Sequence, residues 1–105
     1  MPTIVANTGV ITQINVFTVP EGGQQPLIDL LKEGAAAVRD IPGWLSASIH
    51  RSLDGTRVVN YAQATDKAAF DAVFERLVSK GFIERNRNLG TAHPGVYEVV
   101  FTIEA

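Results

Sequence analysis

The sequence predicts an α+β fold of the ferredoxin-like type, with its elements in the order βαββαβ and an antiparallel sheet. Two observations carry this prediction. Stretches with a two-residue apolar period alternate with two stretches of helical period, and an Asp-Gly pair joins two β-prone runs. Right-handed crossovers then place the first and third strands at the centre of the sheet and both helices on one face. A chain of 105 residues has room for one such domain, over residues 1–105.

The first strand is predicted over 10–19, where Ile14 and Val16 alternate with more polar neighbours. A helix is expected to begin near Pro26, because proline suits a first helical turn, and to end at Pro42-Gly43. Its apolar side chains form a single stripe at helical spacing, which comprises Leu27, Leu30, Leu31, Gly34, Ala35 and Val38.

A β-hairpin is expected next, with strands over 44–53 and 56–64. Asp54-Gly55 between two β-prone runs is the strongest local signal for a hairpin. A two-residue turn would pair Leu45 with Ala64, and side chains of that parity would lie under the helices.

The second helix is predicted to begin at Asp66, a good N-cap, and to end at Lys80-Gly81. Residues 82–89 are expected to form a short helical turn. The last strand is predicted over 96–103, because apolar side chains alternate there. One face of the second helix carries the apolar residues Phe70, Val73, Phe74 and Leu77.

The sheet face without helices is predicted to be partly apolar. Ile14 and Val16 point to it from the first strand, and the last strand carries apolar residues on both sides, Val96 and Val100 among them. A bare apolar sheet is an aggregation hazard, and a two-fold copy of the same sheet is its simplest cover. We therefore expect a homodimer that forms sheet to sheet.

Composition excludes several classes of protein. Nine Lys plus Arg oppose eleven Asp plus Glu with no basic stripe, which argues against nucleic-acid binding. Without cysteine there are no disulfides, thiolate metal sites or Cys nucleophile. No apolar run approaches the ~20 residues of a membrane span, and no signal peptide is recognisable, so a soluble cytoplasmic protein is expected. Phosphate loops, nucleophile elbows and dinucleotide fingerprints are also missing, so we expect no cofactor.

Small and bulky residues are expected to face each other between the sheet and the second helix. The small residues on the hairpin are Ala47, Ala62 and Ala64, and the bulky ones on the helix are Phe70, Val73 and Phe74. These residues either pack tightly or leave a pocket with Asn60 in its wall, which Asn15 of the first strand is able to reach. A buried asparagine also serves the core by pairing with backbone groups, so both readings stay open.

Five further residues allow more than one interpretation or only a weak one. His50 either acts as a base, as histidine side chains do in many enzymes, or lines the dimer interface, which its register favours. His93 lies in a predicted turn, and two histidines this far apart with no third ligand predict no metal site. Trp44 is read as a core residue beside the pocket. Arg85 and Arg87 are either surface charge, which we favour, or face an anionic or phenolate substrate at the pocket mouth.

The middle of the chain resembles the antibiotic biosynthesis monooxygenase (ABM) domain. The residues that carry the resemblance are the run from Pro42 to His50, the turn Asp54-Gly55-Thr56 and the run from Val58 to Gln63. The similarity is greatest to small Streptomyces enzymes that oxidise aromatic polyketide anthrones or quinols to quinones. It implies a dimeric α+β barrel that needs neither metal nor flavin, because the deprotonated substrate reduces dioxygen directly and the protein donates hydrogen bonds to the developing oxyanion.

The resemblance also implies roles for single residues. Asn60 is the main donor to the oxyanion, Asn15 a supporting donor and His50 a proton acceptor. Two positions depart from the family: Ala64 stands where Trp is common, and Phe70 where the quinone-forming members have Tyr. The expected substrate-binding residues are Ala64, Phe70, Phe74, Trp44 and Arg85. The departures leave two alternatives open, a non-catalytic dimer that binds a hydrophobic small molecule and a pathway isomerase or cyclase that uses the same cavity.

Overall fold

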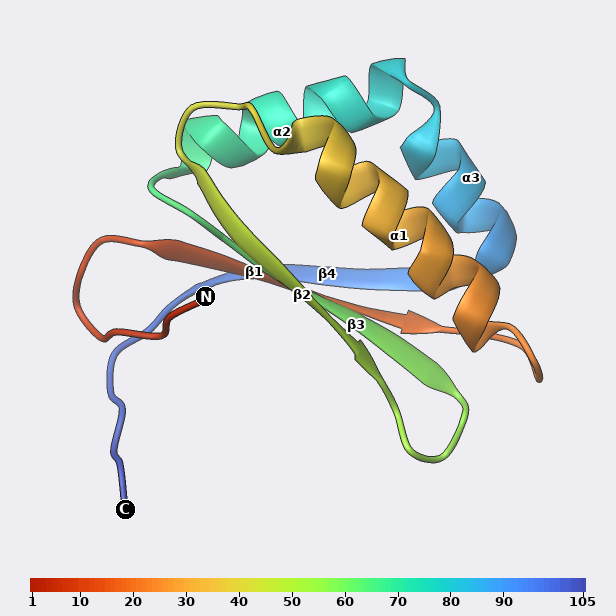
Figure 1. Ribbon diagram of the computed structural model, residues 1–105, viewed down its shortest axis with the longest axis horizontal. Coiled ribbons are helices and arrows are strands. Elements are labelled where there is room, and N and C mark those ends of the chain that lie inside the picture. Colours follow the sequence, from red (N-terminus) through yellow and green to blue (C-terminus); the bar gives the residue numbers. More distant parts are fainter.

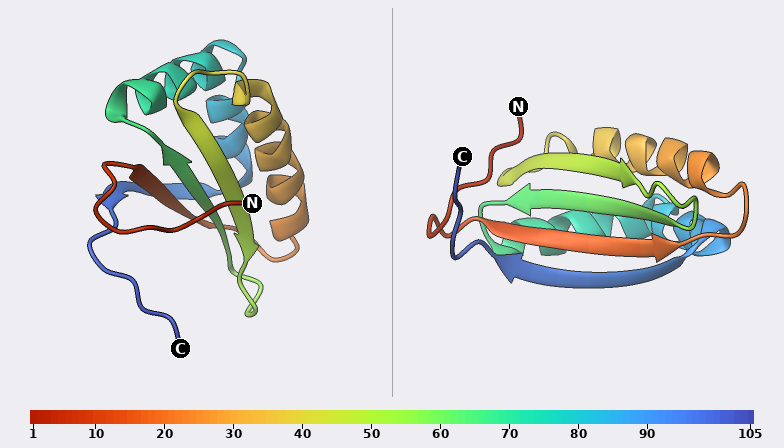
Figure 2. Two further views of the ribbon diagram at one scale, coloured as in Figure 1. Left: turned by 60° about the vertical axis from the view of Figure 1, so that its left-hand side comes forward. Right: turned by 90° about the horizontal axis from the view of Figure 1, so that it is seen from below.

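The protein, described for residues 1–105 by a computed structural model, has two layers, an antiparallel sheet and a layer of helices on one of its faces (Figure 1). Figure 2 (right) views the sheet from the side without helices, and the strands lie in front of the helix layer. The elements in chain order are β1 (Ile11–Thr18), α1 (Gln24–Val38), β2 (Trp44–Arg51), β3 (Arg57–Ala64), α2 (Lys67–Ser79), α3 (Phe82–Leu89) and β4 (Thr91–Glu98).

The strands lie in the order β2-β3-β1-β4, and every neighbouring pair is antiparallel. The first and third strands therefore occupy the centre of the sheet, which confirms the predicted ferredoxin-like arrangement. The short helical turn expected over 82–89 is a complete helix, α3, and packs beside α1 on the same face (Figure 1).

The ends of the helices follow from local chemistry. Helix α1 begins at Gln24, two residues before the expected start, so Pro26 lies in its first turn. At the start of α2 the Asp66 carboxylate accepts a hydrogen bond of 2.9 Å from the backbone N–H of Ala69, as an N-cap does. Helix α2 stops before Gly81, whose φ of 80° lies in the left-handed region that glycine tolerates.

The hairpin register was predicted correctly from Ala47 to Arg51 and wrongly at the start of β2. Ile49 lies opposite Asn60 as expected, but a β-bulge places Trp44, not Leu45, opposite Ala64. The extra residue in the bulge leaves Leu45 half exposed instead of under the helices. The bulge therefore decides which large side chain of β2 reaches the space beneath the helix layer.

The turn of the hairpin is wider than two residues. The Ser52 N–H donates to the carbonyl of Arg57, and Leu53 at the tip is fully exposed. The Asp54 carboxylate shapes this loop, since it accepts hydrogen bonds from the backbone N–H of Thr56 and from the hydroxyl of Ser52. The strands consequently end two residues earlier and begin one residue later than the pattern suggested.

The last strand was predicted over 96–103 and lies at Thr91–Glu98 instead. Pro94-Gly95 was read as a turn, but β4 is an edge strand, where proline is tolerated because one side of the strand has no partner. Gly95 leaves room for the Tyr97 side chain to lie across the strand. His93 therefore belongs to a strand and not to a turn.

The residues after β4 have no strand to pair with. Ile11, the first residue of β1, lies opposite Glu98, and beyond it only the Asn7 N–H bonds to the carbonyl of Val99. The segment 99–105 runs away from the sheet, on the side opposite the helices (Figure 1). An alternating apolar pattern needs a neighbouring strand to become a strand, and this chain provides none here.

The core between the layers consists of three small clusters rather than one. The first joins Phe17 and Val58 of the sheet to Leu27 and Leu31 of α1, the second lies between β3 and α2, and the third joins the end of α1 to α2. The separation of these clusters leaves space between them. None of the helices is long and apolar enough to cross a membrane.

Candidate active site

A cavity of about 210 Å³ lies between the sheet and the helices. All four strands and all three helices contribute to its wall, and 15 of the 22 lining residues are hydrophobic. Of the two readings that the sequence left open, the structure therefore shows a pocket and not a tightly packed core. Such an enclosed, mostly apolar space with a few polar groups is typical of a site for a small molecule.

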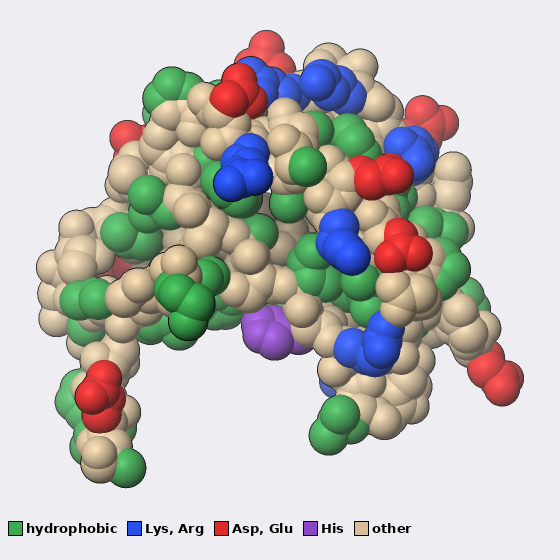
Figure 3. All heavy atoms as spheres, viewed as in Figure 1, with side chains coloured by type: hydrophobic (Ala, Val, Ile, Leu, Met, Phe, Trp, Pro, Cys, Tyr) green, Lys and Arg blue, Asp and Glu red, His purple; other side chains and the backbone are tan.

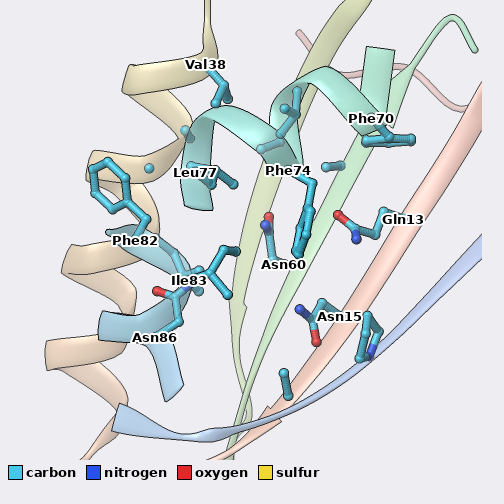
Figure 4. Close-up of a pocket in the computed structure, with 18 of the residues that line it drawn as sticks. Gln13, Asn15, Val38, Asn60, Phe70, Phe74, Leu77, Phe82, Ile83 and Asn86 are labelled. Carbon is cyan, nitrogen blue, oxygen red and sulfur yellow. The ribbon is translucent and has the colours of Figure 1, made fainter. Parts of the chain in front are cut away.

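Five polar side chains interrupt the apolar wall. Gln13 and Asn15 of β1 and Asn60 of β3 lie on the sheet side, while Asn86 and Arg87 of α3 lie on the helix side. Figure 4 shows the amides of the sheet across the cavity from Asn86. The site is thus amide-rich on both sides of an apolar space.

Asn15 and Asn60 are direct neighbours. The register of β1 and β3 places the two residues opposite each other, and both side chains face the cavity (Figure 4). Directly opposed side chains on antiparallel strands have Cβ atoms roughly 4.5–5.5 Å apart. One polar group of a ligand is therefore within reach of both amides.

The two amides differ in how they are held. The Oδ1 of Asn15 accepts a hydrogen bond of 3.1 Å from the backbone N–H of His93. Since this bond occupies the amide oxygen, the NH₂ group of Asn15 remains to donate to a ligand. The Oδ1 of Asn60 is buried and has no hydrogen-bond partner. Asn60 is therefore not a core asparagine whose oxygen is satisfied by the backbone, and it needs a partner that the folded chain does not supply.

Aromatic side chains form much of the remaining wall. Trp44 of β2, Phe70 and Phe74 of α2 and Phe82 at the start of α3 all line the cavity. Phe70 is buried, whereas Phe74 is 54% exposed although it lines the cavity, which places it at the mouth. Flat, aromatic walls favour a planar aromatic ligand, which stacks on such rings.

The cavity wall contains one tryptophan, Trp44, which belongs to β2. Ala64, where the resemblance leads one to expect Trp, is fully buried and does not line the cavity. Its partner across the ladder is Trp44, which the bulge turns toward the helices and which does line the cavity. The predicted place of Ala64 in the cavity wall was wrong, because Trp44 and α2 cover it.

Two predicted site residues lie outside the cavity. His50 is opposite Val59 on the face without helices, where its ring meets Tyr61 edge to face with centroids 6.5 Å apart. Arg85 points away from the cavity, with its guanidinium 3.4 Å from the carboxylate of Glu33. The alternation of a strand takes His50 to the other face, and the helical period takes Arg85 to solvent. Neither residue reaches a ligand held by the sheet amides of the same chain.

Sequence reasoning missed two polar residues of the wall, Gln13 and Asn86. Gln13 has the same strand parity as Asn15, which was a sufficient signal for its face. Asn86 belongs to α3, for which only a turn was expected. Arg87, for which a place at the pocket mouth was one of two interpretations, does line the cavity. The signal for Asn86 was its position in the apolar stripe of the helix, which otherwise comprises Phe82, Ile83 and Leu89.

Ionisable groups are almost absent from the wall. Arg87 is the one titratable residue among the 22 that line the cavity. The pKa of Asp54 and that of Asp40 are lowered, by hydrogen bonds from Thr56 and Arg76 respectively, but both carboxylates lie outside the cavity. No group of three His, Cys, Asp or Glu side chains is placed to hold a metal ion. The wall can bind, orient and stabilise an oxyanion, but it contains no carboxylate or imidazole that accepts a proton.

Comparison with known proteins agrees with this description. The chain is 40% identical over 74 residues to tetracenomycin-F1 monooxygenase of Streptomyces glaucescens, an alignment that covers 70% of this chain and 66% of that protein. The chain thus spans slightly less than two thirds of the length of this curated relative.

Solved structures share the fold over almost the whole chain. SnoaB, a cofactor-independent oxygenase from Streptomyces nogalater, matches with a TM-score of 0.82 at 23% identity, over 93% of this chain and 100% of that one. A monooxygenase from the gene ActVA-Orf6 of Streptomyces coelicolor, in complex with nanaomycin D, matches with a TM-score of 0.79 at 29% identity, over 90% and 91%.

The family itself is assigned over residues 10–85, which match the family described as "Antibiotic biosynthesis monooxygenase". This stretch includes β1 and β3 with their paired amides and the first half of α3. The chain therefore belongs to the antibiotic biosynthesis monooxygenase family.

Proposed function

We propose that the protein is a cofactor-independent monooxygenase that oxidises an aromatic, polyketide-like anthrone or dihydroquinone with dioxygen. The observation that carries this proposal is the pair of adjacent amides, Asn15 and Asn60, in an apolar cavity with aromatic walls. Hydrogen-bond donors held in a water-poor site stabilise an oxyanion far better than water does. The named activities of the relatives support the same chemistry.

The reaction follows from what this wall supplies. An anthrone loses its acidic C–H proton to water, because no side chain of the cavity accepts it, and its enolate oxygen accepts N–H bonds from Asn15 and Asn60. The enolate gives one electron to dioxygen, and the two radicals couple to form a C–O bond and, after protonation, a hydroperoxide. A second C–H proton leaves the same carbon as the O–O bond breaks and hydroxide departs. The sum is anthrone plus O₂ to anthraquinone plus water.

The test is oxygen uptake with anthrone and a dihydroquinone. We expect uptake by the protein and a loss of at least tenfold in Asn60→Ala, about 1.4 kcal/mol in the barrier. Asn88→Ala, an exposed residue of α3 outside this cavity, is the matched control and is expected to keep its rate. Equal rates for Asn60→Ala and the unaltered protein would remove Asn60 from the mechanism.

One observation favours a second candidate, a non-catalytic protein that binds a hydrophobic small molecule. The cavity holds no proton acceptor, and Phe70 has no hydroxyl to relay a proton. Ligand binding without oxygen uptake across a panel of quinols would favour this candidate. The same lack of a proton acceptor disfavours an isomerase or cyclase, whose product would form equally well without oxygen.

We also propose that the protein works as a homodimer through the sheet face without helices. Ile14 and Val16 face this side from the central strand β1, and Tyr97 of β4 is 54% exposed on it. In Figure 3 this face is a hollow with a histidine in it, between the segment 99–105 and the β2–β3 hairpin, which both project to the same side. A second copy fills the hollow, and the apolar side chains of both projections then pack against its surface.

A further inference from the structure

The α3 side of the cavity contains a second unpartnered amide. The Oδ1 of Asn86 is buried and has no hydrogen-bond partner, as is also true of Asn60 across the cavity. Figure 4 shows Asn86 on α3 beside Ile83, and the strands that carry Asn60 and Asn15 form the other side of the cavity. Two buried amide oxygens without hydrogen-bond partners lower the stability of the folded chain, because neither regains the hydrogen bonds that it made to water.

Asn86 has no structural task that would explain it. Its side chain makes no hydrogen bond to the backbone or to another residue, although its backbone carbonyl accepts the N–H of Gly90 at the end of α3. Asparagine is also a poor helix former, and the neighbouring positions of the inner stripe, Phe82, Ile83 and Leu89, are apolar. A leucine at this position would suit both helix and core better, so the amide points to a ligand.

We propose that Asn86 binds an oxygen substituent of the ligand on the edge opposite the one held by Asn15 and Asn60. The cavity then selects planar aromatics that are oxygenated on two opposite edges over those oxygenated on one. This inference rests on the proposed function in one respect, that the ligand is a planar aromatic.

The state of the three amides sets the kind of substituent that each accepts. Asn15 has its oxygen engaged by the His93 N–H, so it only donates to a ligand, which suits a carbonyl or an enolate. Asn86 has neither its oxygen nor its NH₂ group engaged, so rotation of the amide presents a donor or an acceptor. It therefore holds a hydroxyl or a carbonyl equally well. The amides of the sheet bind the oxygen at the reacting edge of the ligand, and Asn86 of α3 binds the oxygen substituent at the opposite edge.

Binding of two naphthols tests this inference without any turnover. The probes are 1-naphthol, oxygenated on one edge, and 1,5-dihydroxynaphthalene, oxygenated on two opposite edges, titrated by calorimetry under nitrogen. We expect the diol to bind at least tenfold more tightly than 1-naphthol, and Asn86→Leu to abolish that preference while the affinity for 1-naphthol changes less than twofold. Hydrogen-bonding sites discriminate strongly against analogues that leave a polar group unpaired.

Matched variants separate recognition from structure. Asn88→Leu, on the exposed side of the same helix, is expected to keep the preference. Because leucine adds bulk toward the cavity, Asn86→Ala is the second variant, and it is expected to lose the preference in the same way. A preference that survives both Asn86 variants, or an equal loss for both naphthols, would overturn the inference.

The outcome is distinguishable from that of the proposed function. If the naphthol preference depends on Asn86 but no quinol or anthrone drives oxygen uptake, the oxygenase proposal fails and the two-sided recognition stands. If oxygen uptake depends on Asn60 but neither naphthol preference nor turnover responds to Asn86, the inference fails alone. If neither naphthol binds the unaltered protein, the inference is overturned together with the aromatic site.

Discussion

Asn15 shows how a single backbone contact gives a side chain a fixed chemical role. An amide in a cavity is able to present either its oxygen or its NH₂ group, and only an outside partner decides between them. Here the backbone N–H of His93 decides, because it occupies the amide oxygen at 3.1 Å. Pro94, opposite Asn15 in the ladder, has no N–H of its own to offer. The edge strand thus turns Asn15 into a dedicated donor.

The substitution Asn15→Asp tests this role. The carboxylate still accepts the His93 N–H but has no N–H for the ligand, and it places a negative charge beside an oxyanion. We expect oxygen uptake to fall at least tenfold while the fold is kept, as followed by circular dichroism and an oxygen electrode. A rate within twofold of the unaltered protein would contradict the donor role of Asn15.

Single residues were predictable from sequence wherever strand parity decided their place. Parity put Asn60 under the helices and His50 on the other face, and the structure has both there. Parity did not reveal that Asn15 and Asn60 are exact neighbours, because that depends on how β1 and β3 align, which no local pattern encodes. Asn86 was missed because its helix was expected only as a turn.

At the scale of elements, the sequence predicted the interior of each strand better than its ends. The bulge before Ser46 cannot be read from alternation, since both Trp44 and Leu45 are large and apolar. Strand β4 was displaced in the prediction because its true partner, β1, is remote in the chain, whereas Pro94-Gly95 acts locally as a turn signal. Long-range pairing overrode local propensity in both places.

The hairpin loop is the element in which pH should alter stability. Hydrogen bonds from Thr56, and then from Ser52, hold the pKa of the Asp54 carboxyl well below its ordinary value of about 3.9. A carboxyl with a depressed folded-state pKa stabilises the fold above its unfolded pKa, and this contribution is lost as the pH falls through the lower folded pKa.

We therefore expect Asp54→Asn to be less stable than the unaltered protein by a constant amount above about pH 5. The difference should shrink as the pH falls below about 4, because the Asp54 carboxyl of the unfolded chain then gains a proton, which favours unfolding. Urea denaturation between pH 2 and pH 7 measures both curves. Parallel curves over the whole range would show that the loop does not hold Asp54 ionised.

At the scale of the whole molecule, the two layers leave one face of the sheet without cover. This face lies between two projections, the β2–β3 hairpin and the segment 99–105 (Figure 1). Phe101 and Ile103 of that segment are more than 70% exposed, which is unusual for large apolar residues that alternate. On the helix layer Phe74 and Val78 are 54% and 50% exposed, less than Phe101 and Ile103, so association is expected through the sheet.

Size-exclusion chromatography with light scattering tests the homodimer. We expect the mass of two chains at micromolar concentration, and a shift toward one chain in Ile14→Lys, which places a charge at the centre of the open face. Glu75→Lys, on an exposed position of α2, is the control and should leave the mass unchanged. A stable single chain in the unaltered protein would rule out the covered sheet.

The cavity lies between the sheet and the helices, whereas the proposed dimer face is the other side of the sheet, so a partner copy bound there is separated from the cavity by the sheet. Each copy in an assembly should then saturate on its own, with one binding site per chain, a Hill coefficient near one and no cooperativity between sites. An assembly that mixes intact chains with chains disabled at Asn60 should retain activity in simple proportion to the intact fraction. Association of two chains would therefore affect stability and solubility but not the catalytic rate of each chain.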